Sequence, residues 1–269
     1  MTSLTRPPTR LYSKIRVTHA HAVLLITLAY PERRNAIGPQ MTNELLWALD
    51  DAHADEAVRA IVITGEGKAF CAGGDFAQMT GAEADSARLP HKGDYADLLL
   101  AMLHAEKPIV ARVNGPAMGG GLGLVAASTF AVAHHDAKLG TPEIDVGLFP
   151  FMIMAVLARL VPRRKLLDMM LTGHKLTAQE AREFGIVNRV TEGGELLDDV
   201  VREITDVLVK KSPSTIALGL RAFAKQDDMD IERALPMLRT SLAECLATED
   251  AQEGLMAFLE KREPRWQGR

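Results

Sequence analysis

Apolar runs and helical spacing alternate along the first two thirds of the chain. Residues 22–28, 60–64 and 108–113 are apolar and rich in β-branched side chains, which is typical of buried strands. Between them, apolar residues recur at helical spacing over residues 42–52 and 95–105. Strands that alternate with helices in this way indicate an α/β domain.

Polar residues and proline mark where several helices are expected to begin. Thr42 is the candidate N-cap of the first helix. Thr177 and Glu180 have the spacing of a capping box, and Pro213 fits the first turn of a later helix. The last helix is expected to start after Thr248. The last third of the chain is therefore predicted to be mainly helical.

Two glycine-bearing turns, residues 71–75 and 117–121, each follow one of the apolar strands. Small residues let a ligand approach backbone N–H groups closely, and the start of a helix adds partial positive charge. Two such turns can direct two N–H donors at one point, which is how an oxyanion is stabilised in a transition state. Either turn alone is better explained as a tight chain reversal. The pair, followed by Thr141-Pro142-Glu143, favours a catalytic site.

Composition limits what such a site can bind. The 269 residues are 47% hydrophobic and 25% charged, which suits one large globular domain or a domain with an appendage. The net charge is −4, so no general affinity for DNA is expected, and a polyanionic ligand has to be met by local basic residues. Cys71 and Cys245 form no disulfide framework and fit a reducing compartment. The apolar run over residues 22–30 is too short for a membrane span, so a cytoplasmic location is expected.

Short motifs spread over nearly the whole chain form an ordered set. They are residues 31–36 (PERRNA), 67–75 (GKAFCAGGD), 107–115 (KPIVARVNG), 119–121 (GGG), 140–143 (GTPE), 171–173 (LTG), 178–190 and 253–262. In this order they resemble the crotonase superfamily, the enoyl-CoA hydratase/isomerase family. The resemblance implies a specific α/β fold, a crotonase-type right-handed spiral of ββα turns.

The resemblance also divides the chain. Residues 1–190 are expected to form the spiral core with the acyl-CoA site, and residues 191–269 a C-terminal helical trimerisation region. In the family this region covers the active site and builds a trimer, often paired into a hexamer. The apolar content of residues 253–262 is too high for a free terminus, which favours a homotrimer or hexamer here as well. The polar stretch over residues 80–94 is expected to be a mobile loop over a pocket.

Catalytic roles follow from the same resemblance. It places the two oxyanion donors at the backbone N–H groups of Ala72 and Gly120, and the catalytic acid/base at Glu143. Burial beside an acyl chain is expected to raise the pKa of that carboxyl group. The substrate is then an acyl-CoA thioester. CoA is part of the substrate, so no cofactor is implied.

Two positions depart from the hydratase pattern. The second glutamate of the hydratases would fall at Gly123, and the bulky residues 151–154 replace a glycine-rich turn that helps to seat water. The leading prediction is an enoyl-CoA hydratase-like lyase of fatty acid or related acyl-CoA metabolism. One carboxylate can also shuttle a proton between two carbons, so a Δ3,Δ2-enoyl-CoA isomerase is the alternative. A non-catalytic protein that binds acyl-CoA or RNA, and a purely structural trimer, are further alternatives. Asp145 is a second candidate acid that is expected to point elsewhere.

Basic and apolar residues near the motifs are candidates for binding the substrate. The resemblance places Arg33, Lys68 and Lys261 near CoA, and in the family the last of these sometimes reaches a neighbouring subunit. The candidates for the acyl pocket are Phe76, Met79, Met118, Phe149 and Phe151. Methionine and phenylalanine at these positions are equally well explained as core residues.

Two further groups invite a chemical interpretation. His134-His135-Asp136 has the residue types of metal ligands, but adjacent histidines usually point apart and no second ligand cluster follows. An exposed turn is therefore predicted, without a metal. Cys71 lacks a motif that would activate it as a nucleophile and is interpreted as a small packing residue.

Overall fold

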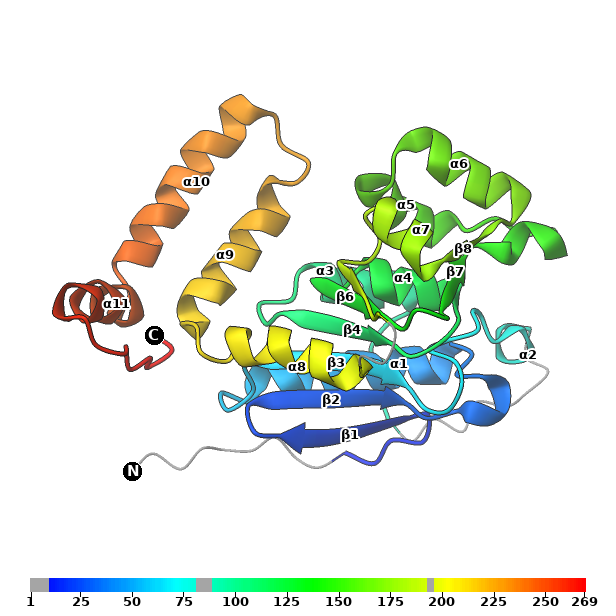
Figure 1. Cartoon of the computed structure of the whole chain (residues 1–269), viewed down its shortest axis with the longest axis horizontal. Coiled ribbons are helices and arrows are strands. Elements are labelled where there is room, and N and C mark those ends of the chain that lie inside the picture. Colours follow the sequence, from blue (N-terminus) through cyan, green and yellow to red (C-terminus); the bar gives the residue numbers. More distant parts are fainter. Residues whose placement is uncertain (1–9, 81–88, 193–195) are drawn as a thin grey trace.

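The computed structural model describes residues 10–80, 89–192 and 196–269, and within these ranges the main sheet has six strands. They lie in the order β1-β2-β3-β4-β6-β9 (Figure 1). β1 pairs antiparallel with β2, and the later neighbours pair in parallel. The strands are β1 (Ile15–Ala20), β2 (Val23–Leu28), β3 (Ala60–Gly65), β4 (Ile109–Val113), β6 (Phe130–Ala133) and β9 (Arg189–Val190). The three predicted apolar strands are thus confirmed as β2, β3 and β4.

A second, smaller sheet carries the turns that follow these strands. Among the described residues it has the order β5-β7-β8, made of β5 (Ala117–Met118), β7 (Lys138–Gly140) and β8 (Lys175–Thr177). Two isolated parallel bridges, Cys71 to Ala117 and Ile37 to Gly74, add segments from earlier turns of the chain. Successive turns therefore alternate between the two layers, which is the ββα spiral expected from the sequence.

Helices cover both faces of the main sheet. α1, α3 and α4 pack on one face, and α8 lies across the other face over β4 and β6 (Figure 1). The helices are η1 (Pro31–Arg33), α1 (Pro39–Ala54), α2 (Phe76–Met79), α3 (Tyr95–Leu103), α4 (Gly120–Ala126), η2 (Pro142–Val146), α5 (Phe151–Leu160), α6 (Arg163–Thr172), α7 (Ala178–Glu183), α8 (Leu197–Leu208), α9 (Pro213–Gln226), α10 (Ile231–Leu246) and α11 (Glu249–Glu260).

The central strands are buried on both faces. On β3, Ile61 and Ile63 join the core beneath α1, whereas Val62 points into the smaller cluster beneath α8. On β4, Val110 belongs to the same smaller cluster. A strand that buries both faces has to be apolar at successive positions, which is why these segments read as continuous apolar runs.

Three of the predicted helix starts are confirmed. Thr177 and Glu180 form the capping box of α7, with each side chain accepting from the other residue's backbone N–H group. Pro213 is the first residue of α9. The Thr248 side chain caps α11. In each case a side chain or a proline removes the need for a backbone acceptor at the helix start.

The predicted cap at Thr42 is wrong. α1 begins at Pro39, and Gly38 is its N-cap residue. Proline has a helical φ and no N–H group to satisfy, so it starts the helix four residues earlier than an N-cap at Thr42 would. Thr42 is buried inside the helix, with its N–H group bonded to the Gly38 carbonyl (3.0 Å).

The last three helices form an arm that extends away from the two sheets. α11 lies at the opposite end of the molecule from α2 (Figure 1). Asp250 ties the arm together, because its buried carboxylate accepts hydrogen bonds from the hydroxyl groups of Ser212 and Ser214 and from two N–H groups of the C-terminal tail. α9, α11 and the tail thus form one connected unit.

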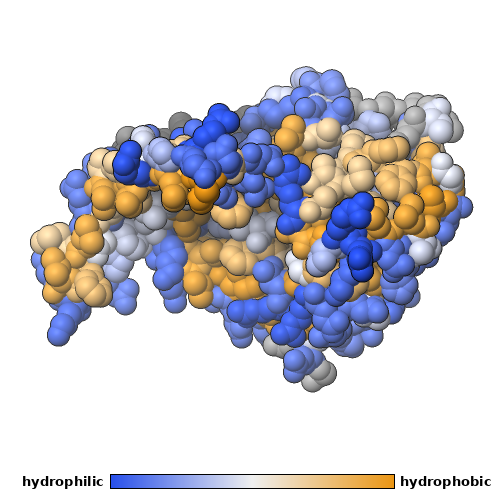
Figure 2. Space-filling model, turned by 90° about the horizontal axis from the view of Figure 1, so that it is seen from above, coloured by the Kyte–Doolittle hydropathy of each residue, from blue (hydrophilic) through white to orange (hydrophobic). Residues whose placement is uncertain are grey.

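Large apolar side chains are exposed on this arm. Figure 2 shows them as orange areas at its left end. The most exposed include Phe223, Leu235, Leu242, Leu255, Phe258 and Leu259. Apolar surface gathered in this way marks an interaction site. In the part of the chain that the structure describes, no helix combines the length and the apolar character needed to cross a membrane.

Replacing Leu98 by alanine is expected to lower the free energy of unfolding by about 2–5 kcal/mol, because its side chain is fully buried in α3 and its loss leaves a cavity. Leu100 lies on the same helix and is 51% exposed. Leu100→Ala is therefore a matched control, with an expected change within about 0.5 kcal/mol. Urea unfolding followed by circular dichroism measures both. Equal effects of the two substitutions would contradict the packing of α3.

Candidate active site

The two glycine turns meet because their segments pair in parallel. The Cys71 N–H group donates to the Pro116 carbonyl (3.1 Å), and the Met118 N–H group donates to the Cys71 carbonyl (2.9 Å). A Cβ atom at Gly73 would lie 3.4 Å from the Met118 carbonyl oxygen. Gly73 has a φ of +109° and Gly119 a φ of +49°, which other residues adopt only with strain. Both turns therefore belong to one local structure.

The loop around η1 holds the first turn in place. Asn35 has a left-handed backbone, and its side-chain amide donates to the carbonyls of Glu66 and Ala69 (2.9 Å each). These bonds place the Arg34 carbonyl beside the turn. There it accepts a hydrogen bond from the Ala72 N–H group (3.0 Å).

This bond corrects the first oxyanion donor expected from the sequence. The Ala72 N–H group is engaged within the protein and is not available to a ligand. Gly74, two residues on, is the central residue of a parallel bridge to Ile37. The Ile37 N–H group donates to the Gly73 carbonyl (2.8 Å), and the Asp75 N–H group donates to the Ile37 carbonyl (2.9 Å). In such a bridge the N–H group of the central residue points away from the partner. The Gly74 N–H group has no acceptor among the described residues.

Gly120 has a second open N–H group. It is the first residue of α4, where an N–H group has no acceptor within the helix. The N-cap residue is Gly119, which has no side chain that could accept the bond. In the described ranges no other group accepts from Gly120 N–H. Among the described residues, each glycine turn thus has an unengaged donor: Gly74 N–H on the first turn and Gly120 N–H on the second.

Glu143 lies against the second turn, at Gly119. A Cβ atom at Gly119 would lie 2.8 Å from Glu143 Oε1 and 3.6 Å from the Gly73 Cα atom. The other carboxylate oxygen, Oε2, is buried and has no hydrogen-bond partner among the described residues. Burial raises the pKa of Glu143. A buried carboxylate oxygen without a partner is suited to a proton or to a ligand.

Two other candidate groups do not take part in this arrangement. Asp145 is exposed, and its Oδ1 atom lies 2.9 Å from where a Cβ atom at Gly173 would be, at the end of α6. The expectation that it points elsewhere is confirmed. Cys71 is fully buried, and burial raises the pKa of its thiol to about 12. The thiol stays protonated and packs against Gly121, so its interpretation as a packing residue is confirmed.

A tyrosine fills the place where the side chain of a second glutamate would start. A Cβ atom at Gly123 would overlap the hydroxyl group of Tyr95 and would lie 2.5 Å from Ile153 Cγ2. Tyr95 begins α3, and its hydroxyl group donates a hydrogen bond to the Gly120 carbonyl. Sequence reasoning missed this residue, because α3 and α4 are separated in the chain and only their packing brings them together. A polar aromatic residue at the start of an otherwise apolar helix was the available signal.

The three candidate cations lie in two places. Arg33 ends η1, and Lys68 stands three residues before Cys71, so both are exposed on the loops that lead into the first turn. Lys261 follows α11, at the far end of the molecule from α2 (Figure 1). Arg33 and Lys68 thus lie on segments next to the first turn, whereas Lys261 belongs to the far end of the chain's fold.

The candidate apolar residues surround the site to different extents. Met118 and Phe149 are half-buried. Phe76 is 46% and Phe151 is 70% exposed, and the Phe151 ring packs against Phe149 at a centroid distance of 5.3 Å. The side chain of Met79 lies outside the described residues, as does most of the predicted loop over residues 80–94. The exposed phenylalanines stand at the surface beside the site rather than within the core.

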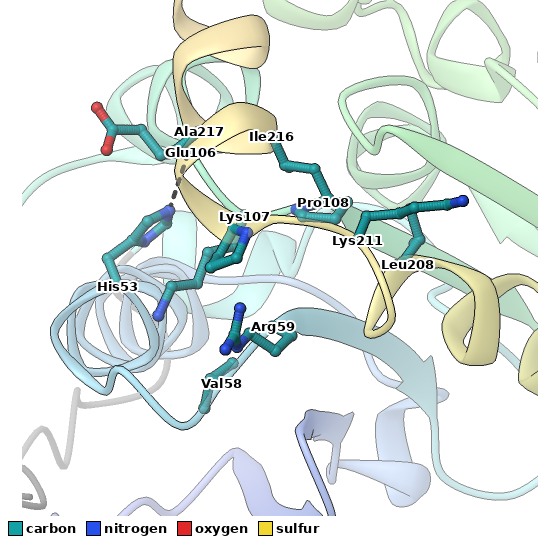
Figure 3. Close-up of a pocket in the computed structure, with 11 residues that line it drawn as sticks. His53, Val58, Arg59, Glu106, Lys107, Pro108, Leu208, Lys211, Ile216 and Ala217 are labelled. Atoms are coloured by element: carbon teal, nitrogen blue, oxygen red, sulfur yellow. Dashed lines mark hydrogen bonds between the residues drawn. The ribbon is translucent and has the colours of Figure 1, made fainter. Parts of the chain in front are cut away.

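A small pocket lies at the end of the main sheet where β3 and β4 begin, so at the amino ends of these two strands (Figure 3). Its volume is about 100 Å³. Ligand pockets measure roughly 300–1,000 Å³, so it does not fit an acyl-CoA. Lys107, on its wall, donates to the carbonyls of Ala52 and Asp55 (2.8 and 2.6 Å). This lysine caps the end of α1, which is a structural role.

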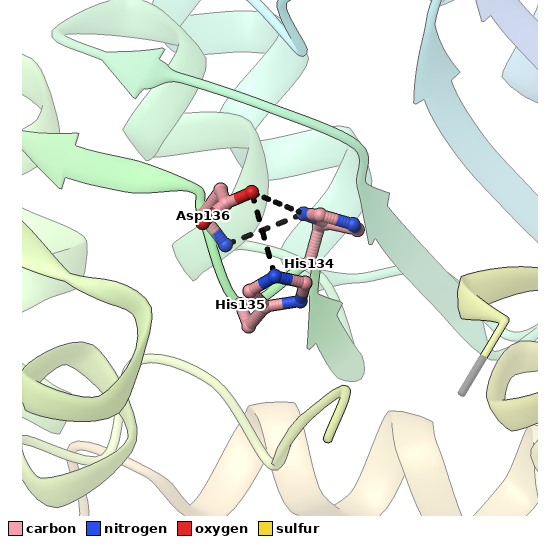
Figure 4. Close-up of side chains that lie close together, drawn as sticks. All are labelled: His134, His135 and Asp136. Carbon is pink, nitrogen blue, oxygen red and sulfur yellow. Dashed lines mark hydrogen bonds and ion pairs between the residues drawn. The ribbon is translucent and has the colours of Figure 1, made fainter. Parts of the chain in front are cut away.

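His134, His135 and Asp136 form a compact exposed cluster after β6 (Figure 4). The expectation that adjacent histidines point apart is wrong here, because their rings stack at 4.2 Å. The Asp136 carboxylate lies 3.4 Å from His135 Nε2, and the Asp136 N–H group donates to His134 Nδ1 (3.3 Å). That bond closes the turn from His134 to Asp136. The absence of a metal at this turn stays a prediction.

Comparison with known proteins agrees with this architecture. The family model for enoyl-CoA hydratase/isomerase matches residues 18–269. An enoyl-CoA hydratase domain-containing protein 3 of Rattus norvegicus is 33% identical over 241 residues, covering 90% of this chain and 80% of the relative. A carnitinyl-CoA dehydratase of Escherichia coli K12 is 34% identical over 261 residues, covering 95% and 98%. The crystal structure of an enoyl-CoA hydratase of Mycobacterium smegmatis matches with a TM-score of 0.85 and 33% identity, covering 94% of this chain and 99% of the other. The chain therefore belongs to the enoyl-CoA hydratase/isomerase family.

Proposed function

We propose that this protein is an enoyl-CoA hydratase-like enzyme that adds water across the double bond of a 2-enoyl-CoA thioester. The observation that carries the proposal is the meeting of two unengaged N–H groups with a buried, unpartnered carboxylate oxygen. Relatives named for enoyl-CoA and carnitinyl-CoA support the substrate class. CoA enters as part of the substrate, and the reaction requires no further cofactor.

In the proposed reaction the N–H groups of Gly74 and Gly120 bind the thioester carbonyl oxygen. The oxygen of water bonds to C3, and Glu143 accepts a proton from that water. The electron pair of the C2–C3 double bond moves onto the thioester, and the resulting enolate oxygen is stabilised by the two donors. One such donor contributes about 3–4 kcal/mol in other enzymes. Glu143 then returns its proton to C2.

The burial of Glu143 suits this double duty. A carboxylate with an ordinary pKa is a weak base and takes a proton from water poorly at neutral pH. Burial raises the pKa of Glu143, which brings it closer to the working pH and makes the protonated form easier to reach. The buried Oε2 atom is the oxygen that exchanges the proton in this proposal.

The rest of the substrate is assigned to the surroundings of the first turn. Arg33 and Lys68 are proposed to meet the phosphates of CoA, because both are exposed beside that turn. Met118, Phe149 and Phe76 are proposed to contact the acyl chain. The identity of that acyl chain is not specified by these residues, and a role in fatty acid or related acyl-CoA metabolism and a cytoplasmic location stay predictions.

A Δ3,Δ2-enoyl-CoA isomerase is the second candidate, favoured by one observation. Position 123 carries no carboxylate, and Tyr95 and Ile153 fill the space beside it. An isomerase needs only one base that moves a proton between C2 and C4, and Glu143 can supply it. The non-catalytic alternatives leave the unengaged donors and Glu143 without a role.

The exposed apolar face of the C-terminal arm supports a homotrimer or hexamer. Phe258 is 81% exposed on α11, and Leu259 is 74% exposed beside it. An oligomer would bury this surface. It would also allow Lys261 of one chain to approach the site of another, which a single chain does not allow.

Glu143→Gln is expected to lower kcat for hydration by about 100-fold or more, because the amide cannot accept or return a proton. Binding of a saturated acyl-CoA should stay within a few-fold, as the volume of the side chain is preserved. Asp145→Asn is the matched control, since Asp145 is an exposed carboxylate two residues away. Steady-state absorbance at the enoyl thioester band measures the rate. Retention of more than a tenth of the wild-type kcat in Glu143→Gln would contradict the assignment.

Light scattering of the full chain at micromolar concentration is expected to give the mass of a trimer or hexamer. Replacing Phe258 and Leu259 together by aspartate should shift the mass towards the monomer, because it places charge in the apolar face of α11. Asp228→Asn, an exposed change near the end of α9, serves as the control. A monomer mass for the wild-type protein would refute the assembly.

A further inference from the structure

The hydroxyl group of Tyr95 lies where a carboxylate from position 123 would have to pass. A Cβ atom at Gly123 would overlap this hydroxyl group, and a Cβ atom at Gly120 would lie 3.5 Å from Tyr95 Cζ. Tyr95 thus faces the first turn of α4 along the side that Gly120 and Gly123 share. The glycine at 123 is the partner of the tyrosine, because any side chain there would displace the hydroxyl group.

The bonding of Tyr95 leaves it able to accept but not to donate. Its single O–H proton is given to the Gly120 carbonyl. A phenol oxygen has acceptor capacity besides its donor, so one lone pair remains open to a second donor. Burial, with added repulsion from charge on Glu143, raises the pKa of Tyr95, so the hydroxyl group stays protonated and is no base.

A water molecule would satisfy two open acceptors at once. Glu143 Oε2 is buried without a partner, and the Tyr95 oxygen has an unused lone pair. Both residues contact the second glycine turn, Tyr95 at Gly120 and Glu143 at Gly119. Water has two donor hydrogens, one for each acceptor, and buried polar groups are normally satisfied in this way.

We infer that Tyr95 positions the attacking water by accepting a hydrogen bond from it, while Glu143 takes the water's other proton. This inference rests on the proposed hydration. The water oxygen bonds to C3, and the water O–H bond whose proton passes to Glu143 breaks. The C2–C3 π bond breaks as well: its electron pair moves onto the thioester and then forms the C2–H bond with the proton that Glu143 returns. The second hydrogen stays on the oxygen, bonded to Tyr95, and becomes the hydroxyl hydrogen of the 3-hydroxyacyl product. One carboxylate is then sufficient, because the tyrosine orients the water and Glu143 alone moves the proton.

Two rates on the same preparation separate this role from a structural one. The first is kcat for hydration of a 2-enoyl-CoA, which needs the water. The second is the exchange of the C2 protons of a saturated acyl-CoA with D2O, followed by mass spectrometry, which needs only Glu143 and the oxyanion donors. Tyr95→Phe keeps the ring but removes the oxygen. Tyr12→Phe is the matched control, because it removes a hydroxyl group bonded to Asp51 on another part of the core.

Tyr95→Phe is expected to lower the hydration kcat by roughly 10- to 100-fold, the cost of a misplaced reactant, while KM and C2 exchange stay within about threefold. Tyr12→Phe should leave both rates unchanged. Circular dichroism and thermal unfolding establish that both variants are folded.

Three results would overturn the inference. Equal losses of hydration and exchange would mean that Tyr95 acts through Gly120 and the oxyanion donors. Full hydration by Tyr95→Phe would mean that the tyrosine only packs. In both cases wild-type hydration would still support the proposed function. Absence of hydration in the wild type, with C2 exchange intact, would instead remove the proposed function together with this role for Tyr95.

Discussion

The parallel pairing of Cys71 with Ala117, on the strand that leads into α4, is the constraint on which the site depends. It brings two glycine turns from different ββα units into contact, at a separation that side chains would prevent. A Cβ atom at Gly119 would collide with the Glu143 carboxylate, so the glycine is also what lets the carboxylate lie against the second turn. Sheet pairing therefore fixes the relative positions of two donors and one base without any bond between the three functional groups.

Backbone bonding then decides which donors are open. In a fully paired segment every N–H group would be engaged, and none would be left for a ligand. Here the Arg34 carbonyl takes the Ala72 N–H group, while the bridge to Ile37 leaves the Gly74 N–H group pointing the other way. The same selectivity applies to acceptors. Tyr95 donates its hydrogen bond to the Gly120 carbonyl and keeps a lone pair, and Glu143 Oε2 has no partner in the part of the chain that the structure describes. A substrate oxygen could accept from the open N–H groups, and a water molecule could donate to the open acceptors.

Much of this could be predicted from the sequence, because strong local patterns carry it. Continuous apolar runs predicted β2, β3 and β4, and the order of the motifs predicted the family and the spiral.

The predictions that were wrong or incomplete concern single residues, and each has a physical cause. The choice between Ala72 and Gly74 depends on which N–H group the protein itself engages: the Arg34 carbonyl accepts from Ala72, and Gly73, with a φ of +109°, separates the two residues. Tyr95 was out of reach because it meets Gly123 only through helix packing. The helix α1 starts at Pro39 and has no cap at Thr42, because proline has a helical φ and lacks an N–H group that would need an acceptor. The close approach of the His134 and His135 rings depends on the backbone angles of the turn, which the spacing of residues in the sequence does not predict.

A crystal structure of the protein with a bound acyl-CoA tests the central claim most directly. The thioester carbonyl oxygen is expected within about 2.7–3.1 Å of both the Gly74 and the Gly120 nitrogen atoms. The Ala72 N–H group should remain bonded to the Arg34 carbonyl, and the Glu143 carboxylate should face C2 of the acyl group. A thioester oxygen bound by Ala72 N–H, or held away from both glycine turns, would contradict this account of the site.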